Sequence, residues 1–246
     1  MQENIVLMYH CVYDALPEET GFQNKGASTY KLPASQFEEQ VKAIRAMYTQ
    51  KMPVVFTFDD GGISFYKVIA PIIEKYGIRG IFFISTGYIG TEGFLSAEQI
   101  ADLHERGHII GSHSHSHPEN MAKLSAREIA REWALSDEIL AKITGGPIVA
   151  ASIPNGFASK QIYRSMIASG ITELYTSDPT TDVKFKGTAR IIGRFAVTND
   201  MSAEYVLSMI ADKSVRRKRY LRFKALSLCK AILGDSYLKI RKKILR

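Results

Sequence analysis

The sequence predicts an α/β protein in which parallel strands close into a distorted barrel. Short apolar, β-branched runs alternate with stretches of helical spacing, a pattern typical of strand–helix units around a parallel sheet. Seven such runs occur, and no glycine-rich nucleotide loop follows the first, which favours barrel closure over an open Rossmann sheet. The 246 residues, 46% of them hydrophobic, can bury the core of one large domain.

Each predicted element has its own signal. Strands are expected at residues 4–10, 54–58, 80–85, 108–112, 147–153, 172–177 and 189–197. Helices are expected at residues 35–48, 64–76, 96–106, 125–143, 159–169 and 202–212. Ser96 and Ser125 begin two of these helices, and each has Gln or Glu three residues later, as in a capping box. Gly77, Gly107 and Gly170 stand where helices should stop.

The net charge of +7 is distributed unevenly. Residues 214–246 carry twelve Lys or Arg and one acid, a local charge of +11, which leaves −4 for the rest of the chain. We therefore expect a catalytic domain at 1–213 and a basic, amphipathic helical extension at 214–246. The two cysteines, Cys11 and Cys229, form no CxxC pair and suit a reducing compartment or simple burial.

Polar residues follow the ends of most predicted strands. In parallel α/β folds the carboxyl ends of the strands share one rim, where catalytic groups gather. The polar residues at this rim are His10, Asp59, Asp60, His113, Pro154, Asn155, Gly156 and Asp178. Their shared position is a stronger signal than any one of them.

The stretch GSHSHSHPEN at 111–120 contains three alternating histidines. In a strand all three would share one face, whereas in a helical turn only His113 and His117 would meet. Because residues 112–118 leave the predicted strand, a turn is favoured, and His115 should point elsewhere. Solvated loop histidines are the alternative.

The stretch TFDDG at 57–61 places two carboxylates side by side after a strand. A β-turn or helix N-cap is the plainer interpretation, since Asp-Asp-Gly suits both. With two imidazoles nearby, Asp60 would complete the ligand set of a divalent metal and leave open positions, as in a catalytic site. Asp59 would then be free to act as a base.

These motifs resemble those of the polysaccharide deacetylase family, also called the NodB-homology or carbohydrate esterase family 4 group. The likeness covers residues 4–200 and includes a histidine stretch of the form H-S-x-S-H-P. Further matching segments are VLMYHCV, APIIEKYGIRGIFFIS and SIPNGFAS, the last of which looks like the Y-P-x-G variant of the third motif.

The resemblance implies a distorted (β/α)7 barrel and a divalent metal ion, with Zn²⁺ favoured, bound by Asp60, His113 and His117. It also implies hydrolysis of an N-acetyl group from an amino sugar, with Asp59 as general base. A backbone amide near Gly156 could help to hold the oxyanion.

Two family residues are missing. The third motif commonly has an arginine that pairs with the catalytic aspartate, and the matching position here is Ser152. The last-motif histidine, which protonates the leaving amine, should fall within 191–200, and that stretch has none. His10 is our candidate replacement, with a packed strand-end histidine as the alternative. Arg194 could orient the substrate or the catalytic aspartate, or could be a solvated strand residue.

Five residues are expected to contact the substrate. Asp178 takes the approximate place of the family's fourth-motif aspartate. The predicted substrate contacts are Pro154, Asn155, Gly156, Asp178 and Arg194.

The basic extension interleaves cationic residues with Leu221, Leu228 and Ile232, spaced seven and four apart. Such a helix could rest its apolar face on an anionic membrane, or could pack on the barrel with a solvated basic face. Nucleic acid is a poorer partner, because no recognition motif accompanies the charge. No signal-peptide pattern and no apolar run of about 18 residues occur, so we expect a cytoplasmic protein, peripheral at the inner membrane face.

The sequence therefore favours a metal-dependent N-deacetylase of an amino sugar, acting in cell-surface polysaccharide biosynthesis. Two hypotheses stay open beside it: hydrolysis of another C–N bond on the same fold, and a non-catalytic module that binds metal and sugar. The retained metal ligands and Asp59 favour an enzyme, because a binding module needs no free base beside its metal.

Overall fold

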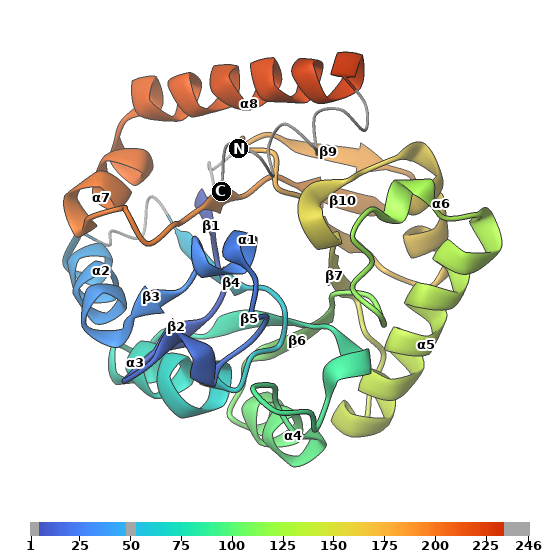
Figure 1. Ribbon diagram of the computed structural model, residues 1–246, viewed down its shortest axis with the longest axis horizontal. Coiled ribbons are helices and arrows are strands. Elements are labelled where there is room, and N and C mark those ends of the chain that lie inside the picture. Colours follow the sequence, from blue (N-terminus) through green and yellow to red (C-terminus); the bar gives the residue numbers. More distant parts are fainter. Residues whose placement is uncertain (1–4, 48–52, 234–246) are drawn as a thin grey trace.

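Nine strands form one curled sheet with helices on its outer side (Figure 1). The computed structural model describes residues 5–47 and 53–233, with side chains described through residue 228. The order in the sheet is β11 (Phe195–Ala196), β1 (Ile5–Tyr9), β4 (Val54–Phe58), β5 (Gly80–Ile84), β6 (Ile109–Ser112), β7 (Ala150–Ser152), β8 (Glu173–Tyr175), β10 (Ala189–Ile192) and β9 (Val183–Lys186). Only β9 is antiparallel to its neighbour within this described sheet. The predicted α/β barrel is confirmed.

The structure describes eight α-helices, and all but the first lie on the outer side of the sheet (Figure 1). They are α1 (Lys25–Ser28), α2 (Ala34–Met47), α3 (Ala70–Lys75), α4 (Ala97–Glu105), α5 (Ala126–Thr144), α6 (Lys160–Ala168), α7 (Ala203–Ala211) and α8 (Lys213–Leu233). Both predicted capping boxes are present, at Ser96 and Ser125, and each serine accepts the amide of its partner three residues later. Gly77, Gly107 and Gly170 have positive φ at the helix ends where they were expected.

The sequence did not indicate the elements between β1 and α2. There β2 (Val12–Tyr13) and β3 (Leu32–Pro33) pair with each other, and α1 lies between them. This excursion, residues 11–33, lies over the carboxyl ends of the central strands in Figure 1. The predicted helix at 64–76 also differs, because it begins as a π-helical turn, Phe65–Ile69, that leads into α3.

The strand register sets the rim of the barrel. Tyr9 pairs with Phe58, Ile84 pairs with Ser112, and Ser152 pairs with Tyr175. Parallel strands in this register end at similar heights, so the residues that follow them meet at one edge of the sheet. The expected common rim is therefore confirmed.

The seventh predicted strand, 189–197, is interrupted. Its first half, β10, pairs with β8, and its second half, β11, pairs with β1, so the chain between them connects the two sides of the curled sheet. Gly193 and Arg194 lie at the break between them. A side chain at Gly193 would press on the Asp178 carbonyl oxygen and on Thr180, which explains why glycine occupies this position.

Helix α8 leaves the barrel beyond α7. Arg216 donates to the carbonyl oxygens of Met209 and Ile210 at 3.0 and 2.7 Å, and Arg219 donates to that of Ala196 at 2.8 Å. The basic extension is helical up to residue 233, while 234–246 and the side chain of Ile232 lie outside the described residues. None of the described helices is long and apolar enough to cross a membrane.

The break at Gly193 gives a first prediction. Gly193→Ala should lower the free energy of unfolding by about 2 kcal/mol, because the new Cβ must displace the backbone of the neighbouring loop. Urea unfolding followed by circular dichroism measures this loss. Gly146→Ala is the control, since nothing lies within 4 Å of a Cβ there. Equal stabilities for the two variants would contradict the tight approach at Gly193.

Candidate metal centre

The two adjacent carboxylates after β4 diverge because their backbones differ. The amide of Asp59 donates to the Tyr9 carbonyl oxygen at 3.0 Å and continues the pairing of β4 with β1. Asp60 has a φ of 91°, which turns its side chain in another direction. Both residues are buried. The prediction that one carboxylate could bind a metal beside the other is compatible with this backbone.

The histidine stretch forms the predicted turn. The amide of His117 donates to the hydroxyl of Ser114 at 3.2 Å, and the amides of His115 and Ser116 donate to one oxygen of Glu132 on α5. The ring of His115 turns away and lies 3.0 Å from the hydroxyl of Thr86. Glu132 thus anchors the turn, a role that the sequence did not indicate.

Asp60, His113 and His117 converge on one point. The Oδ1 atom of Asp60 lies 3.4 Å from the Nε2 atom of each histidine, and all three potential ligand atoms lie within 4.8 Å of one another. The Nδ1 atom of His113 is 3.1 Å from the carbonyl oxygen of Ser152, an atom that can only accept. Nδ1 therefore carries the proton, and Nε2 offers its lone pair to the centre.

This donor set fits a divalent metal ion. One carboxylate oxygen and two imidazole nitrogens suit Zn²⁺ or a similar ion and leave positions for water and substrate. Burial alone would raise the pKa of Asp60, but the imidazoles of His113 and His117 beside it hold the pKa well below the ordinary value. The carboxylate is therefore ionised, as a metal ligand must be.

Backbone strain concentrates at the same place. Four non-glycine residues in the described ranges have φ in the left-handed region: Asp60, Ser114, His117 and Asn155. Such conformations cost about 1–3 kcal/mol each and tend to persist where the surrounding structure fixes a functional geometry. All four belong to the loops that carry the candidate ligands or face them.

Asp59 is held by Arg194 rather than by a residue after β7. The guanidinium donates to both carboxylate oxygens, at 2.6 and 2.7 Å, and also to Thr57 and Thr176. Burial would raise the pKa of Asp59, but Arg194 and then His113 outweigh it and lower the pKa. Arg194 is fully buried, so its interpretation as a solvated strand residue is wrong. It orients Asp59, and its predicted contact with the substrate stays a prediction.

Ser152 stands where the family's arginine was expected and contacts the same carboxylate. Its hydroxyl donates to the Oδ1 atom of Asp59 at 3.3 Å and lies within hydrogen-bond distance of the Nδ1 atom of His113. The Oδ2 atom of Asp59 lies 4.0 Å from the Nε2 atom of His113. Oδ2 therefore faces the centre while accepting from Arg194, and Oδ1 accepts from both Arg194 and Ser152.

His10 lies beside this centre. Its ring packs on Tyr30 with the ring centroids 4.4 Å apart, and its Nδ1 atom is buried without a hydrogen-bond partner among the described residues. Burial lowers its pKa, whereas the charges of Asp60 and Asp59 act in the opposite direction. The ring is thus close enough for the charges of both carboxylates to affect its pKa, as its predicted place on the rim requires.

The other predicted substrate contacts separate into two groups. Pro154–Gly156 forms a short 3₁₀ turn at the rim, with Asn155 exposed and its side-chain amide donating to the Pro118 carbonyl oxygen at 3.3 Å. The amide of Gly156 donates to Ile153 at 3.2 Å, so this amide is not free for an oxyanion. The main-chain carbonyl oxygen of Asp178 accepts from the amide of Arg194 at 2.9 Å, and the substrate contact of Asp178 stays a prediction.

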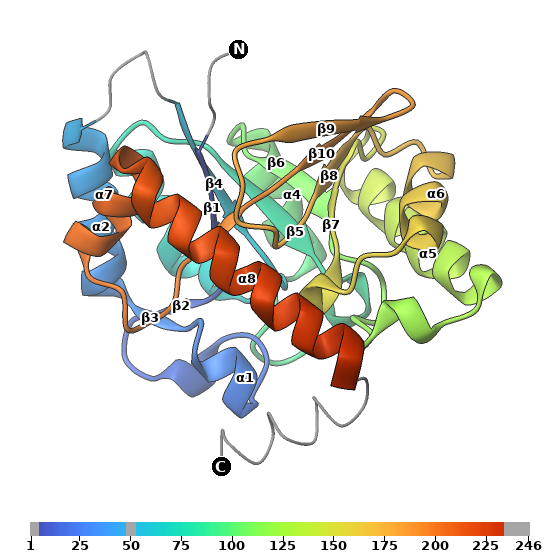
Figure 2. The same ribbon diagram turned by 90° about the horizontal axis from the view of Figure 1, so that it is seen from above.

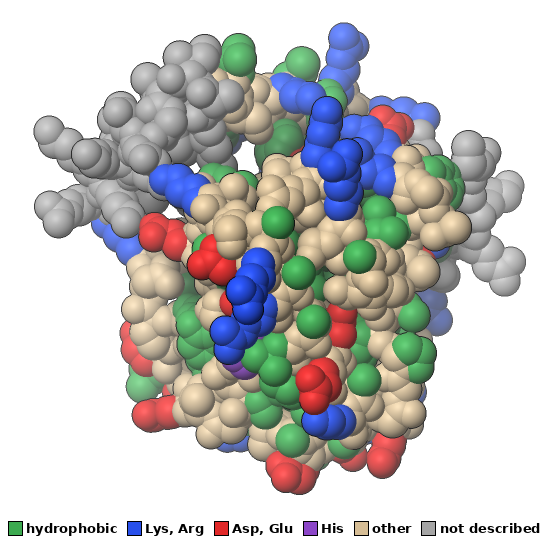
Figure 3. Space-filling model, turned by 90° about the vertical axis from the view of Figure 1, so that its right-hand side faces the viewer, with side chains coloured by type: hydrophobic (Ala, Val, Ile, Leu, Met, Phe, Trp, Pro, Cys, Tyr) green, Lys and Arg blue, Asp and Glu red, His purple; other side chains and the backbone are tan. Residues whose placement is uncertain are grey.

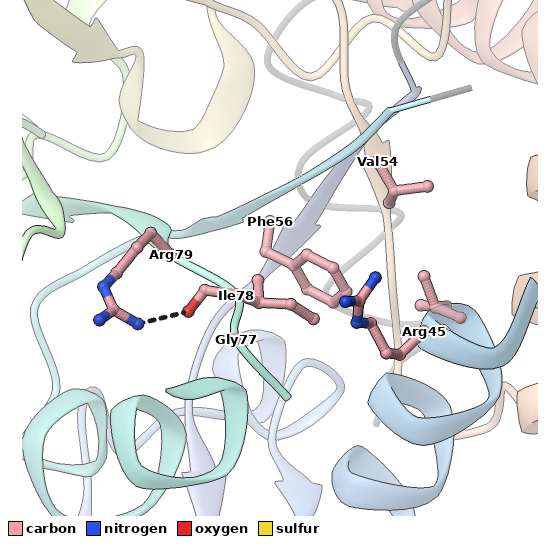
Figure 4. A pocket seen from close by; sticks show the side chains of 7 residues that line it. Arg45, Val54, Phe56, Gly77, Ile78 and Arg79 are labelled. Atoms are coloured by element: carbon pink, nitrogen blue, oxygen red, sulfur yellow. Dashed lines mark hydrogen bonds between the residues drawn. The ribbon is translucent and has the colours of Figure 1, made fainter. Parts of the chain in front are cut away.

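A pocket away from the rim lacks comparable chemistry (Figure 4). It is lined by Ile44, Arg45, Val54, Phe56, Gly77, Ile78 and Arg79. None of these seven residues is a histidine or an acid, and Arg79 donates to the adjacent Ile78 carbonyl oxygen. The rim therefore holds the candidate site.

An Asp-His-His set at the carboxyl rim of an α/β barrel, with a second carboxylate held beside it, defines a class of open mononuclear metal site. Comparison with known families agrees with this assignment. The model of the family described as polysaccharide deacetylase matches residues 46–174, and the chain belongs to that family.

Individual relatives are similar over part of their length. A chitin deacetylase of Arthroderma benhamiae is 34% identical over 93 residues, which are 38% of this chain and 24% of the relative. A peptidoglycan-N-acetylglucosamine deacetylase of Bacillus cereus is 29% identical over 114 residues, 46% of this chain and 39% of the relative. The chain thus spans less than half of either curated relative.

A solved structure shares the fold over most of the chain. The Streptococcus pyogenes deacetylase PplD, in complex with acetate, superposes with a TM-score of 0.68 at 21% identity, covering 84% of this chain and 97% of PplD. At this identity the likeness shows the fold alone, and it confirms the predicted distorted barrel.

The ion pair of Arg194 with Asp59 gives a second prediction. Arg194→Met should lower the free energy of unfolding by about 3–5 kcal/mol, because it leaves a buried carboxylate without its partner. Arg194→Met combined with Asp59→Asn should lose less, since no unpaired charge remains. Urea unfolding of both variants measures the difference.

The control is Arg190→Met, which removes the half-exposed ion pair with Glu173 and should change stability by no more than about 1 kcal/mol. A double variant less stable than Arg194→Met would contradict the assigned role of the buried charge.

Proposed function

We propose that this protein is a metal-dependent hydrolase that removes the N-acetyl group from an amino sugar. The observation that carries the proposal is the orientation of Asp59, whose Oδ2 atom faces the point where Asp60, His113 and His117 converge. Membership of the polysaccharide deacetylase family supports the reaction class. The names of the chitin and peptidoglycan relatives support an N-acetylated glycan as substrate.

The ligands proposed for the ion, with Zn²⁺ favoured, are Asp60, His113 and His117. When bound, the ion polarises the acetyl carbonyl and makes the attacking water more acidic. Asp59 takes the proton of that water at Oδ2, which lies 4.0 Å from the Nε2 atom of His113 and accepts one hydrogen bond from Arg194, whereas Oδ1 accepts from both Arg194 and Ser152. The low pKa of Asp59 keeps it ionised and able to accept this proton at neutral pH.

His10 is the proposed general acid for the leaving amine. The last-motif stretch supplies Arg194 instead of a histidine, and His10 brings an imidazole with an unpartnered Nδ1 atom to the same rim. The backbone amide of Asn155 is the proposed donor to the oxyanion, since the amide of Gly156 is engaged with Ile153.

The proposed place of the reaction is the cytoplasmic side of a membrane, during assembly of a cell-surface polysaccharide. A lipid-linked or nucleotide-linked amino sugar would be available there. The basic extension at 214–246 supports this location, because cationic residues are attracted to anionic lipid.

Acetate release tests the proposed reaction. Purified protein is incubated with N-acetylated sugars, nucleotide sugars and glycan oligomers, and released acetate and bound metal are both measured. Asp59→Asn should lower kcat by about 10²–10⁴ while the metal content stays unchanged, because Asp59 is a base and not a ligand. His113→Ala and His117→Ala should lose the metal as well.

The control is His115→Ala, since the ring of His115 faces Thr86 and should affect neither metal content nor rate. Stoichiometric metal without acetate from any substrate would contradict the deacetylase proposal and favour a binding module.

The role of His10 predicts a pH dependence. A general acid must be protonated, so kcat/KM should fall as pH rises through the pKa of His10. Because burial lowers that pKa, the fall is expected below the ordinary histidine value of about 6.5. His10→Asn should lower kcat/KM and abolish this alkaline limb, whereas His104→Asn, on the exposed side of α4, should keep it. An unchanged limb in His10→Asn would remove His10 from the mechanism.

A further inference from the structure

Helix α8 has one side that contacts the barrel. Arg216 is buried and Arg219 is partly buried through their hydrogen bonds to main-chain carbonyl oxygens, and Tyr220, Phe223 and Ser227 are also partly buried. At 100° per residue these five positions lie within one side of the helix. The barrel therefore fixes the rotation of α8 about its own axis.

The opposite side of α8 carries a line of apolar residues in solvent. Leu221 and Leu228 are 57% and 62% exposed, and Ala225 between them is also exposed. Their spacing of four and three places them along one line of the helix. The described part of α8 therefore packs on the barrel with basic side chains in solvent, as the alternative expected, and Leu221 and Leu228 remain outside that contact.

Basic residues flank this line on both sides. Arg217 and Lys224 lie along one flank, Lys218 and Arg222 lie along the other, and all four are exposed. The sequence has no acidic residue from 213 to 233. In Figure 3 basic side chains gather at the top of the molecule, at the level where Figure 1 shows α8, and acidic ones are mixed among them lower down.

We infer that this outward side of α8, formed by Leu221, Ala225 and Leu228 with their four basic flanking residues, is a docking surface for an anionic lipid membrane. An apolar line with cationic flanks places leucines at the acyl boundary and basic side chains among the headgroups. Each basic residue near an anionic surface strengthens binding about fivefold, or about 1 kcal/mol.

Other occupants fit this surface less well. A second copy of the chain would bring its own basic flanks against these and add like-charge repulsion. A nucleic acid would meet the basic residues but leave both leucines in contact with a polar backbone. A membrane satisfies the leucines and the cations together.

The position of α8 links this surface to the proposed site. Figure 2 shows α8 crossing one side of the barrel from α7 toward the end where α1 lies. The excursion that carries α1 also brings Tyr30 against His10 at the rim. Docking through α8 would therefore hold the barrel beside the lipid surface, with its catalytic rim toward one end of the bound helix.

Vesicle sedimentation of the full chain tests this inference. Vesicles of phosphatidylcholine with phosphatidylglycerol are compared with vesicles of phosphatidylcholine alone. The wild type should bind the anionic vesicles only, and its binding should weaken with added salt. Leu221→Ser with Leu228→Ser should weaken binding about tenfold or more, and Lys218→Gln with Arg222→Gln should have a similar effect.

The matched control is Leu16→Ser with Val149→Ser, which removes two exposed apolar side chains elsewhere and should bind as the wild type does. Circular dichroism checks that all variants are folded. Absent wild-type binding, or equal binding by the leucine variant, would overturn the inference. So would a dimer that the leucine variant dissociates, or retention on nucleic acid without vesicle binding. Because no substrate is present, these outcomes are independent of the proposed deacetylation.

Discussion

The buried ion pair between Arg194 and Asp59 joins two features that the sequence places far apart. Asp59 follows β4, whereas Arg194 lies at the break between β10 and β11. Removing either charge would leave the other buried alone, so each residue requires the other. The contact that orients the proposed base therefore also links β4 to the segment that connects β10 with β11.

The backbone distinguishes two neighbouring aspartates that have the same chemistry. Asp59 keeps extended pairing with β1, so its carboxylate stays beside Arg194. Asp60 adopts a positive φ, which turns its carboxylate to the two histidines. The strain at Asp60 is sustained because its neighbours on both sides are fixed by strand pairing and by the following glycine turn. Asp59 therefore lies beside a guanidinium and Asp60 beside two imidazoles, although the two residues are adjacent in the sequence.

Features that depend on a local sequence pattern could be predicted from the sequence alone. Alternating runs predicted the strands and helices, and the spacing of His113 and His117 predicted which rings would converge. The contact of Arg194 with Asp59 could not be derived in this way, because strand pairing across the barrel brings together residues 135 positions apart. The anchoring of the histidine turn by Glu132 was missed because it depends on how α5 packs beside that turn, and the excursion at 11–33 has short elements with little periodicity.

The two departures from the family pattern now have a common explanation. Ser152 occupies the expected place of an arginine, and Arg194 lies in the stretch where a histidine was expected. A rim built from the ends of parallel strands permits such exchanges, because several strands reach the same carboxylate from different directions. Arg194, at the break between β10 and β11, binds Asp59 through both carboxylate oxygens. The same geometry allows His10, at the end of β1, to supply an imidazole that the later sequence lacks. Loss of a motif residue is therefore weak support for a non-catalytic module here, since the chemistry depends on which groups meet at the rim and not on their order in the chain.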